Sequence, residues 1–254
     1  FNCTGRLRRS WLYLCVKWRE RKFTCSVLSF RLFYMLWRGL RVLWLEGNGI
    51  DKIENLDYQK ELRTLYLQQN LIRSIENLES CRNIDTLDLS KNYISKIEKL
   101  SHLRMLKTLI LSHNNLTDAK SIEHVTALPE LCTLDLQSNK ISGAEDHEEV
   151  VKVVKMCPSL RVLYLKGNGI TKRIPFYRRT LLSSCSELRY LDDRPVFDEE
   201  RRRCNAWGDV IKNGGSIEDA KQAEQAMIGL IRMEKQECDE RNHRLFKEMA
   251  QCGK

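Results

Sequence analysis

The sequence predicts an α/β fold, a solenoid with a parallel sheet on its concave face and short helices on its convex face, closed by a helical C-terminal cap and a trailing helix. Three observations predict it. A leucine pattern that ends in asparagine recurs six times, an isoleucine-rich motif follows the first copies, and residues 171–207 have the pattern of an array end. Such repetition is typical of architectures in which each unit packs only on its neighbours.

The repeated pattern is L-x-x-L-x-L-x-x-N, with Asn-to-Asn intervals of 22, 22, 22, 25 and 29 residues. Copies of this kind are leucine-rich repeats, and we place six of them in residues 40–170. The L-x-L centre of each copy puts two side chains on one face of a short strand, and parallel stacking of the strands buries them. The central row consists of Leu43, Leu65, Leu87, Leu109, Leu134 and Leu163.

The asparagine that ends each copy lies where the chain must turn. We expect its buried side chain to bond backbone groups that the turn leaves without partners, because an unpaired buried group costs about 1–3 kcal/mol. This asparagine ladder consists of Asn48, Asn70, Asn92, Asn114, Asn139 and Asn168.

The segments after the asparagines contain the motifs IENL, IENL, IEKL and IEHV and are expected to close the convex side. The 22-residue copies leave room there for only a helical turn, whereas the longer copies can hold true helices. The best example is Glu145 to Met156, which has acids in its first turn and valines on one stripe.

Two helical segments are expected after the repeats. In the cap, residues 171–207, Pro175 can start a helix that carries Phe176, Leu181 and Leu182. A charged helix is expected over residues 216–254, with Ser216 and Asp219 as a capping pair. Its apolar stripe is too short to predict a coiled coil and favours a helix packed on its own domain or a solvated arm. The stripe consists of Ala220, Ala223, Met227, Leu230 and Ile231.

The formal charge of +9 is concentrated at the amino end, because residues 1–39 hold nine basic residues and one acid. The rest of the chain is close to neutral and shows no basic footprint for nucleic acid. A further 22-residue copy would place Arg21 in a core position and Ser26 in the asparagine position. We therefore expect residues 1–39 to lie outside the repeat domain and to be largely foreign sequence. The apolar stretch Val27–Trp37 is too short to cross a bilayer, so no membrane contact is predicted.

No catalytic motif is present: the sequence lacks a P-loop, G-x-S-x-G and H-E-x-x-H. Its five histidines and ten cysteines show no metal-ligand spacing, so we predict a non-enzyme without cofactor or metal, whose scattered thiols stay reduced inside the cell. Asp192 and Asp193 form a paired carboxylate beside Arg194. Their place at the end of the cap favours turn formation over acid–base chemistry.

The outward side chains of the strands are the predicted binding surface. Exposed aromatic and aliphatic side chains are unusual on a surface without a partner, and acids between them could receive a lysine or arginine of a partner protein. The alternative is that the N-terminal segment covers Trp44 and the cap covers Tyr164. This concave column consists of Trp44, Tyr66, Asp88, Ile110, Asp135 and Tyr164, and beside it lie Glu46, Gln68, Ser90, Ser112, Gln137 and Lys166.

Three stretches resemble one family. LWLEGNGIDKIENL (43–56), LYLQQNLIRSIENL (65–78) and above all KRIPFYRRTLLSSCSELRYLDDRPVFDEERRRCNAW (172–207) are similar to the leucine-rich-repeat dynein axonemal assembly factor family, over about residues 40–215. The resemblance implies a factor of cilia and flagella that preassembles axonemal dynein arms in the cytoplasm, with dynein arm subunits, chaperones or other assembly factors as partners. It also implies a structural cap signature within Tyr190–Phe197, namely Leu191, Asp192, Asp193, Arg194 and Pro195.

The sequence departs from the family pattern at both ends, because the additional repeat expected before Leu40 is absent and the long extension expected after Lys254 is missing. Since the sequence also begins with Phe and not Met, we expect the chain to be a fragment or an imperfect gene model. Phosphatase regulators, a splicing-factor subunit and a dynein light chain share the 22-residue repeat. A general repeat scaffold or regulatory subunit, in phosphatase targeting or RNA processing, is therefore the alternative function. The sequence sets no oligomeric state.

Overall fold

Short parallel strands stacked in sequence order organise the repeats. The computed structural model describes residues 13–15, 39–142 and 147–252. These fall into two compact units. The repeat unit contains the described residues up to Ile174 together with Glu187–Arg194, and the helical unit contains Pro175–Ser186 and the described residues from Pro195 onward. The cap expected over residues 171–207 is thus divided between the two units.

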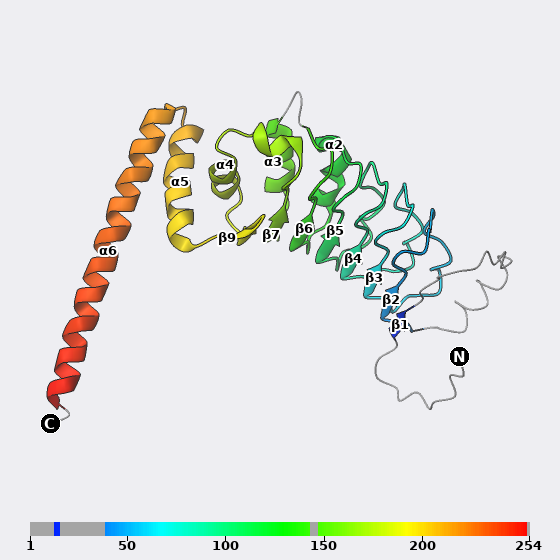
Figure 1. Cartoon of the computed structure of the whole chain (residues 1–254), viewed down its shortest axis with the longest axis horizontal. Helices are drawn as coiled ribbons and strands as arrows, with labels where there is room; N and C mark the ends of the chain where they lie inside the picture. Colours follow the sequence, from blue (N-terminus) through cyan, green and yellow to red (C-terminus); the bar gives the residue numbers. More distant parts are fainter. Residues whose placement is uncertain (1–12, 16–38, 143–146, 253–254) are drawn as a thin grey trace. The chain divides into compact units, whose positions relative to one another are not determined.

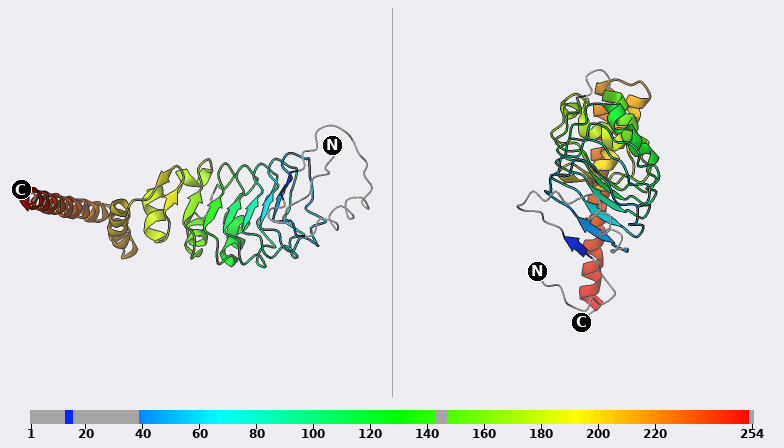
Figure 2. Two further views of the ribbon diagram at one scale, coloured as in Figure 1. Left: turned by 90° about the horizontal axis from the view of Figure 1, so that it is seen from below. Right: turned by 90° about the vertical axis from the view of Figure 1, so that its right-hand side faces the viewer.

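The sheet has nine described strands in the order β1 to β9. The pairings from β1 to β8 are parallel, and each central leucine lies beside the central leucine of the next strand. Figure 1 shows β2 to β7 side by side, and the view from below in Figure 2 shows them as parallel arrows. The strands are β1 (Tyr13–Cys15), β2 (Val42–Trp44), β3 (Thr64–Tyr66), β4 (Thr86–Asp88), β5 (Thr108–Ile110), β6 (Thr133–Asp135), β7 (Val162–Tyr164), β8 (Tyr190–Leu191) and β9 (Arg194–Pro195).

The core of the repeat unit is the row of central leucines. All six predicted leucines, Leu43 through Leu163, have no exposed surface. The convex motifs pack against them from the other side, as Ile75 and Leu78 show by their complete or nearly complete burial. Burial of each such side chain contributes about 1.5–3 kcal/mol, which makes the stack of repeats the main source of stability in this unit.

Within residues 39–142 and 147–174, helices occur on the convex side only in the longer repeats (Figure 1). The segments after Asn48, Asn70 and Asn92 form bends and single hydrogen-bonded turns, such as that from Leu56 to Gln59, because a 22-residue repeat leaves too few residues for a helix. The longer repeats hold α2 (Ala119–Ile122), the 3-10 helix η1 (Glu123–Ala127), α3 (His147–Lys155) and the 3-10 helix η2 (Gly169–Lys172).

The amino-terminal segment departs from expectation at three residues. Tyr13–Cys15 form β1, which pairs in parallel with β2 and places Leu14 beside Leu43, 29 residues later. The sequence analysis considered only a copy with a 22-residue interval, which does not place Leu14 in the core row. Residues 1–12 and 16–38 lie outside the described residues, so the domain boundary at residue 39 stays a prediction.

The helical unit contains α4 (Tyr177–Ser184), α5 (Asp198–Lys212) and α6 (Ile217–Cys252). An ion pair between Arg178 and Glu200 joins α4 to α5 through two hydrogen bonds of 2.6 and 2.7 Å. The nearly buried Glu224 of α6 receives Arg179 at 2.9 Å and Arg203 at 3.0 Å. Because a buried carboxylate without a partner is costly, this network fixes the register of the three helices.

Two details of the helical unit differ from the sequence expectation, and one agrees. Phe176 precedes α4 in a left-handed conformation and is 40% exposed, so the helix carries only Leu181 and Leu182 inward. Leu230 of α6 is 52% exposed, whereas its neighbour Ile231 is buried. The capping pair of α6 is confirmed, because Ser216 and Asp219 exchange hydrogen bonds of 3.0 and 3.1 Å. In the described part of the chain, no helix combines the length and the apolar character needed to cross a bilayer.

Candidate functional site

The concave column is a continuous row across six strands. The register pairs Trp44 with Tyr66 and continues strand by strand to Tyr164. Each of these residues follows a buried central leucine, so the alternation of a strand turns its side chain outward. The structure therefore brings together all six predicted members of the column.

Aromatic pairs lie at both ends of the concave column. The rings of Trp44 and Tyr66 are 5.2 Å apart between centroids and tilted by 38°. At the other end Tyr164 lies 6.0 Å from Tyr190 of β8. Such tilted pairs are worth about 0.5–1.5 kcal/mol beyond the area that they bury, so each pair is held as a preformed contact surface.

The middle of the concave column is acidic and is divided by Ile110. The carboxylate of Asp88 accepts the backbone N–H of Ser90 at 2.9 Å, and that of Asp135 accepts the N–H of Gln137 at the same distance. Both carboxylates are thereby fixed at the ends of their strands. Two oriented carboxylates on one face favour a positively charged partner group.

Burial raises the pKa of Asp135, and the negative charge of Asp88 raises it further. Hydrogen bonds from Gln137 and Ser112 lower this pKa and so oppose the shift. Burial also raises the pKa of Tyr164, and the nearby Tyr190 and Asp135 add to this effect. The Asp135 carboxylate therefore lies where negative charge is poorly solvated. A cation bound at this position would relieve that cost.

The exposure of the concave column is uneven. Trp44 is 38% exposed, and the other five residues are half-buried among their neighbours in the column. Of the residues before Gly39 that could cover Trp44, the structure describes only β1, whose Cys15 pairs with Trp44. The expected cover by the other N-terminal residues lies outside the described residues. At the other end the ring beside Tyr164 is that of Tyr190 in the cap, so the side chain next to this end of the column is itself aromatic.

The asparagine ladder has one repeated geometry. Asn92 is typical: its Nδ2 donates to the carbonyl oxygens of Leu67 and Leu89 at 2.9 Å, and its Oδ1 accepts the N–H of Ile72 at 3.1 Å. Each amide thus joins its own turn to the preceding repeat. The same bonds, at 2.8 to 3.2 Å, are made by Asn70, Asn114, Asn139 and Asn168.

The first ladder residue is less buried than the other five. Asn48 is half-buried, and its Nδ2 donates to Glu46 of its own turn at 3.1 Å. The residue before each ladder asparagine has a positive φ, which is a strained region for a side chain other than glycine. Glycine occurs there twice, and the six residues are Gly47, Gln69, Lys91, His113, Ser138 and Gly167.

The cap signature bonds to the last full repeat through a carboxylate. Asp192 follows the central Leu191 as Tyr164 follows Leu163, and its Oδ1 accepts the N–H groups of Leu165 and Lys166 at 2.7 and 3.0 Å. Asp193 pairs with the ammonium group of Lys166, and this contact raises the pKa of Lys166. Leu191 is buried beside Leu163, whereas Arg194 and Pro195 are exposed.

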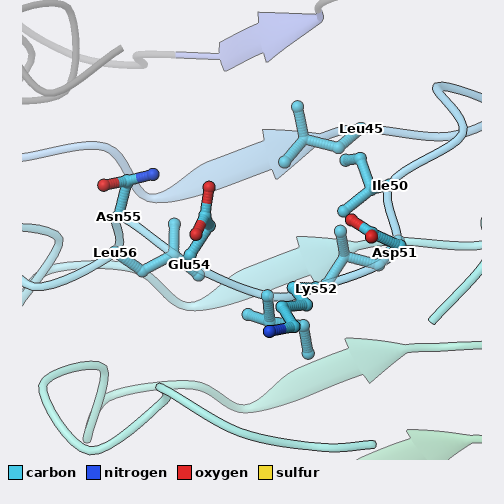
Figure 3. A pocket seen from close by; sticks show the side chains of 9 residues that line it. Leu45, Ile50, Asp51, Lys52, Glu54, Asn55 and Leu56 are labelled. Carbon is cyan, nitrogen blue, oxygen red and sulfur yellow. The ribbon is translucent and has the colours of Figure 1, made fainter. Parts of the chain in front are cut away.

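The first described repeat contains a cavity of about 210 Å³. Figure 3 shows Leu45 and Ile50 at one end of its lining and Asn55 and Leu56 at the other. The charged lining residues Asp51, Lys52 and Glu54 are all exposed. Since none of the polar residues that line it is buried, the cavity has no fixed polar group to orient a ligand.

No group of three or more histidine, cysteine or acidic side chains in the described ranges is arranged to hold a metal ion. Burial raises the pKa of the Cys81 thiol to about 12 and that of Cys204 to about 11, so both stay protonated and unreactive near neutral pH. The concave column is therefore the candidate functional site, and binding is what its arrangement supports.

Sequence reasoning missed Tyr190 as part of this surface. The cap was expected to be helical, whereas Tyr190 pairs with Val162 and extends the sheet by one strand. The signal was present, because the stretch LRYLD repeats the spacing of LRVLY at 160–164.

The repeat class is borne out by comparison with known proteins. A family model described as leucine-rich repeat matches residues 60–213. The fold is similar to an internalin of Listeria monocytogenes, with a TM-score of 0.52 and 21% identity over 67% of this chain and 45% of that one. It is also similar to a leucine-rich-repeat protein of Leptospira interrogans, with a TM-score of 0.51 and 25% identity over 64% and 38% of the two chains. These two structures support the fold alone.

Among curated proteins the chain is similar to leucine-rich repeat-containing protein ODA7 of Chlamydomonas reinhardtii, at 38% identity over 48% of this chain and 26% of that protein. It is 46% identical to human dynein axonemal assembly factor 1, over 30% of this chain and 10% of that protein, and 47% identical to the rat protein, over 31% and 12%. The chain spans about a quarter or less of these relatives. Since the family model covers more than half of the residues, the chain belongs to the leucine-rich-repeat family.

Proposed function

We propose that this protein acts in the cytoplasmic preassembly of axonemal dynein arms, without catalysis of its own, and that the concave column binds the proteins being assembled. The observation that carries the proposal is the similarity to relatives named dynein axonemal assembly factor 1, at 46 to 50% identity over their matched segments. The cap segment Lys172–Trp207 also supports it, because the resemblance to that family is strongest there.

The column supplies the means of binding. Its aromatic ends and its oriented carboxylates fit a partner segment that carries apolar side chains around a lysine or arginine. Six strands about 4.8 Å apart give a surface about 25 Å long, enough for a helix or an extended segment. Partners of this kind are dynein arm subunits, chaperones or other assembly factors, and their work associates the protein with cilia and flagella.

Gene disruption in the source organism tests the assembly role. We expect axoneme cross-sections that lack dynein arms but keep an intact microtubule array, together with reduced dynein heavy chain in the flagellum. Normal arms would contradict the assembly role and leave a repeat scaffold of the phosphatase-targeting or RNA-processing kind.

Copurification tests the binding surface separately. The double variant Trp44→Ala with Tyr66→Ala removes one aromatic end without touching a central leucine, so the fold is retained. We expect loss of dynein subunits or assembly factors from the purified complex. Tyr93→Ala is the matched control, because Tyr93 is 53% exposed and lies in the turn after Asn92. Equal recovery of partners with both variants would rule out the column as the docking surface.

A further inference from the structure

The carboxyl-terminal half of α6 is exposed to solvent in the helical unit. Every residue from Arg232 to Met249 is exposed, whereas Ala220, Glu224 and Ile231 earlier in the same helix are buried. Figure 1 shows this half of α6 continuing past the end of α5. Because most helical stability in proteins comes from packing of an apolar stripe, a bare stretch of this length favours a partner.

The stripe that packs in the first half of α6 continues into the bare half. Cys238, Asn242, Leu245 and Met249 follow one another at intervals of 4, 3 and 4 residues, the spacing of a coiled-coil seam. Asn242 Nδ2 lies 3.8 Å from Cys238 Sγ, which places the two on one face. Leu245 is 51% exposed, Met249 is 70% exposed, and Phe246 beside them is 72% exposed.

The charges of this segment are divided into halves of opposite sign. Glu237, Asp239 and Glu240 make residues 235–240 acidic despite Lys235. The following residues are basic despite Glu248, because they contain Arg241, Arg244 and Lys247. A second copy laid antiparallel places the acidic half of each helix on the basic half of the other, whereas a parallel copy places like charges together.

We propose that residues 235–249 of α6 pair antiparallel with the same segment of a second copy of this chain. In this alignment Cys238 lies opposite Met249, and Asn242 lies opposite Leu245. The flanking positions then bring Arg241 of each copy to Glu248 of the other. Phe246 covers the edge of the seam.

The paired segment is short, about 22 Å at 1.5 Å per residue. Interfaces of small extent are weak, so the association depends on concentration. It does not involve the concave column and stands independently of the proposed function.

Sedimentation equilibrium of the full chain over a range of concentrations tests the proposal. We expect a monomer–dimer equilibrium that Leu245→Glu with Met249→Glu abolishes. The matched control is Met233→Glu, because Met233 is 61% exposed on the same helix but off the seam, and this variant is expected to dimerise as the unaltered chain does. A monomer at all concentrations, or a dimer that survives the double substitution, would overturn the proposal.

Reversed charges test the antiparallel orientation. Arg241→Glu and Glu248→Arg should each weaken self-association, because like charges then meet twice in the dimer. An equimolar mixture of these two variants restores opposite charges at both contacts, so we expect a heterodimer at least as stable as the unaltered dimer. Failure of the mixture to associate would overturn the antiparallel alignment, and circular dichroism of each variant verifies that α6 is intact.

Discussion

Asn92 and Leu67, which lie 25 residues apart in the sequence, are joined by a 2.9 Å hydrogen bond from the asparagine amide to the leucine carbonyl oxygen. The same amide also bonds Leu89 of its own repeat. One buried side chain therefore holds two repeats together.

Replacing Asn92 should destabilise the repeat unit clearly. Asn92→Ala leaves several buried backbone groups without their partner, and each such group costs about 1–3 kcal/mol. We expect a lower urea midpoint in a denaturation experiment. Asn48→Ala should cost less, because Asn48 is half-buried whereas Asn92 is buried. Equal losses for the two variants would contradict a bridging role for the inner asparagines.

The central leucine row predicts a large cavity effect. Leu87 has no exposed surface and lies between Leu65 and Leu109. Leu87→Ala should lower the free energy of unfolding by about 2–5 kcal/mol, measured from urea denaturation. An unchanged midpoint would show that the strand register is wrong.

Gly167 precedes a ladder asparagine with φ at +81°, and an added Cβ would lie 2.9 Å from Oγ of Ser138. Gly167→Ala should therefore cost about 1–2 kcal/mol or more in thermal unfolding. Gly229 in α6 has nothing within 4 Å of an added Cβ, so Gly229→Ala should stabilise the helical unit by about 0.5–1 kcal/mol. The two substitutions are chemically identical, and a shared sign would contradict the backbone argument.

His124 makes the repeat unit sensitive to acid. Its Nε2 accepts the N–H of Leu100 at 2.9 Å, which requires the neutral ring. Burial lowers the pKa of His124 from 6.5, and the charge of Glu98 opposes this shift. The unfolded chain therefore takes up a proton first, so stability falls as the pH falls through about 6.5 and below. In His124→Gln, which keeps an acceptor, this part of the pH dependence should vanish from urea midpoints measured between pH 7 and 5.

Replacing Asp135 should have opposite effects on partner binding and on the stability of the repeat unit. Its pKa is raised in the folded protein, so the stability it contributes is present at low pH and is lost as the pH rises through the folded pKa. Asp135→Asn keeps an oxygen for the Gln137 N–H but removes the charge. At neutral pH we expect a stability equal to or above that of the unaltered protein, with weaker binding of a basic partner segment. A destabilised Asp135→Asn variant would contradict the cost assigned to this carboxylate.

The repeat period was enough to place the strands, because the row from Leu43 to Leu163 follows directly from L-x-L spacing. It could not reveal that the side chain of Asp192, which follows the central Leu191, bonds the N–H groups of Leu165 and Lys166. The spacing of LRYLD was enough to indicate a further strand at Tyr190, but not that this strand, β8, is only two residues long. These features depend on how the array ends, where the repeat no longer constrains the sequence.

The helices of the helical unit could be predicted from the sequence, but the residues that each helix buries could not. The capping pair of Ser216 and Asp219 indicated where α6 begins. The apolar stripe placed Leu230 and Ile231 on one side of the helix and left open whether that side is packed or solvated. Only Ile231 is buried, because the two residues are 100° apart around the helix. Burial there depends on where α5 packs, which no local pattern contains.

Complementation of the disrupted strain tests the central claim most directly. Cells lacking the gene would be given the Trp44→Ala, Tyr66→Ala double variant or the Tyr93→Ala control, each verified to match the unaltered protein in urea midpoint. Dynein arms in axoneme cross-sections would then be scored by electron microscopy. We predict that the control restores the arms and the column variant does not. Full restoration of the arms by the column variant would contradict the claim that the concave column binds the proteins to be assembled.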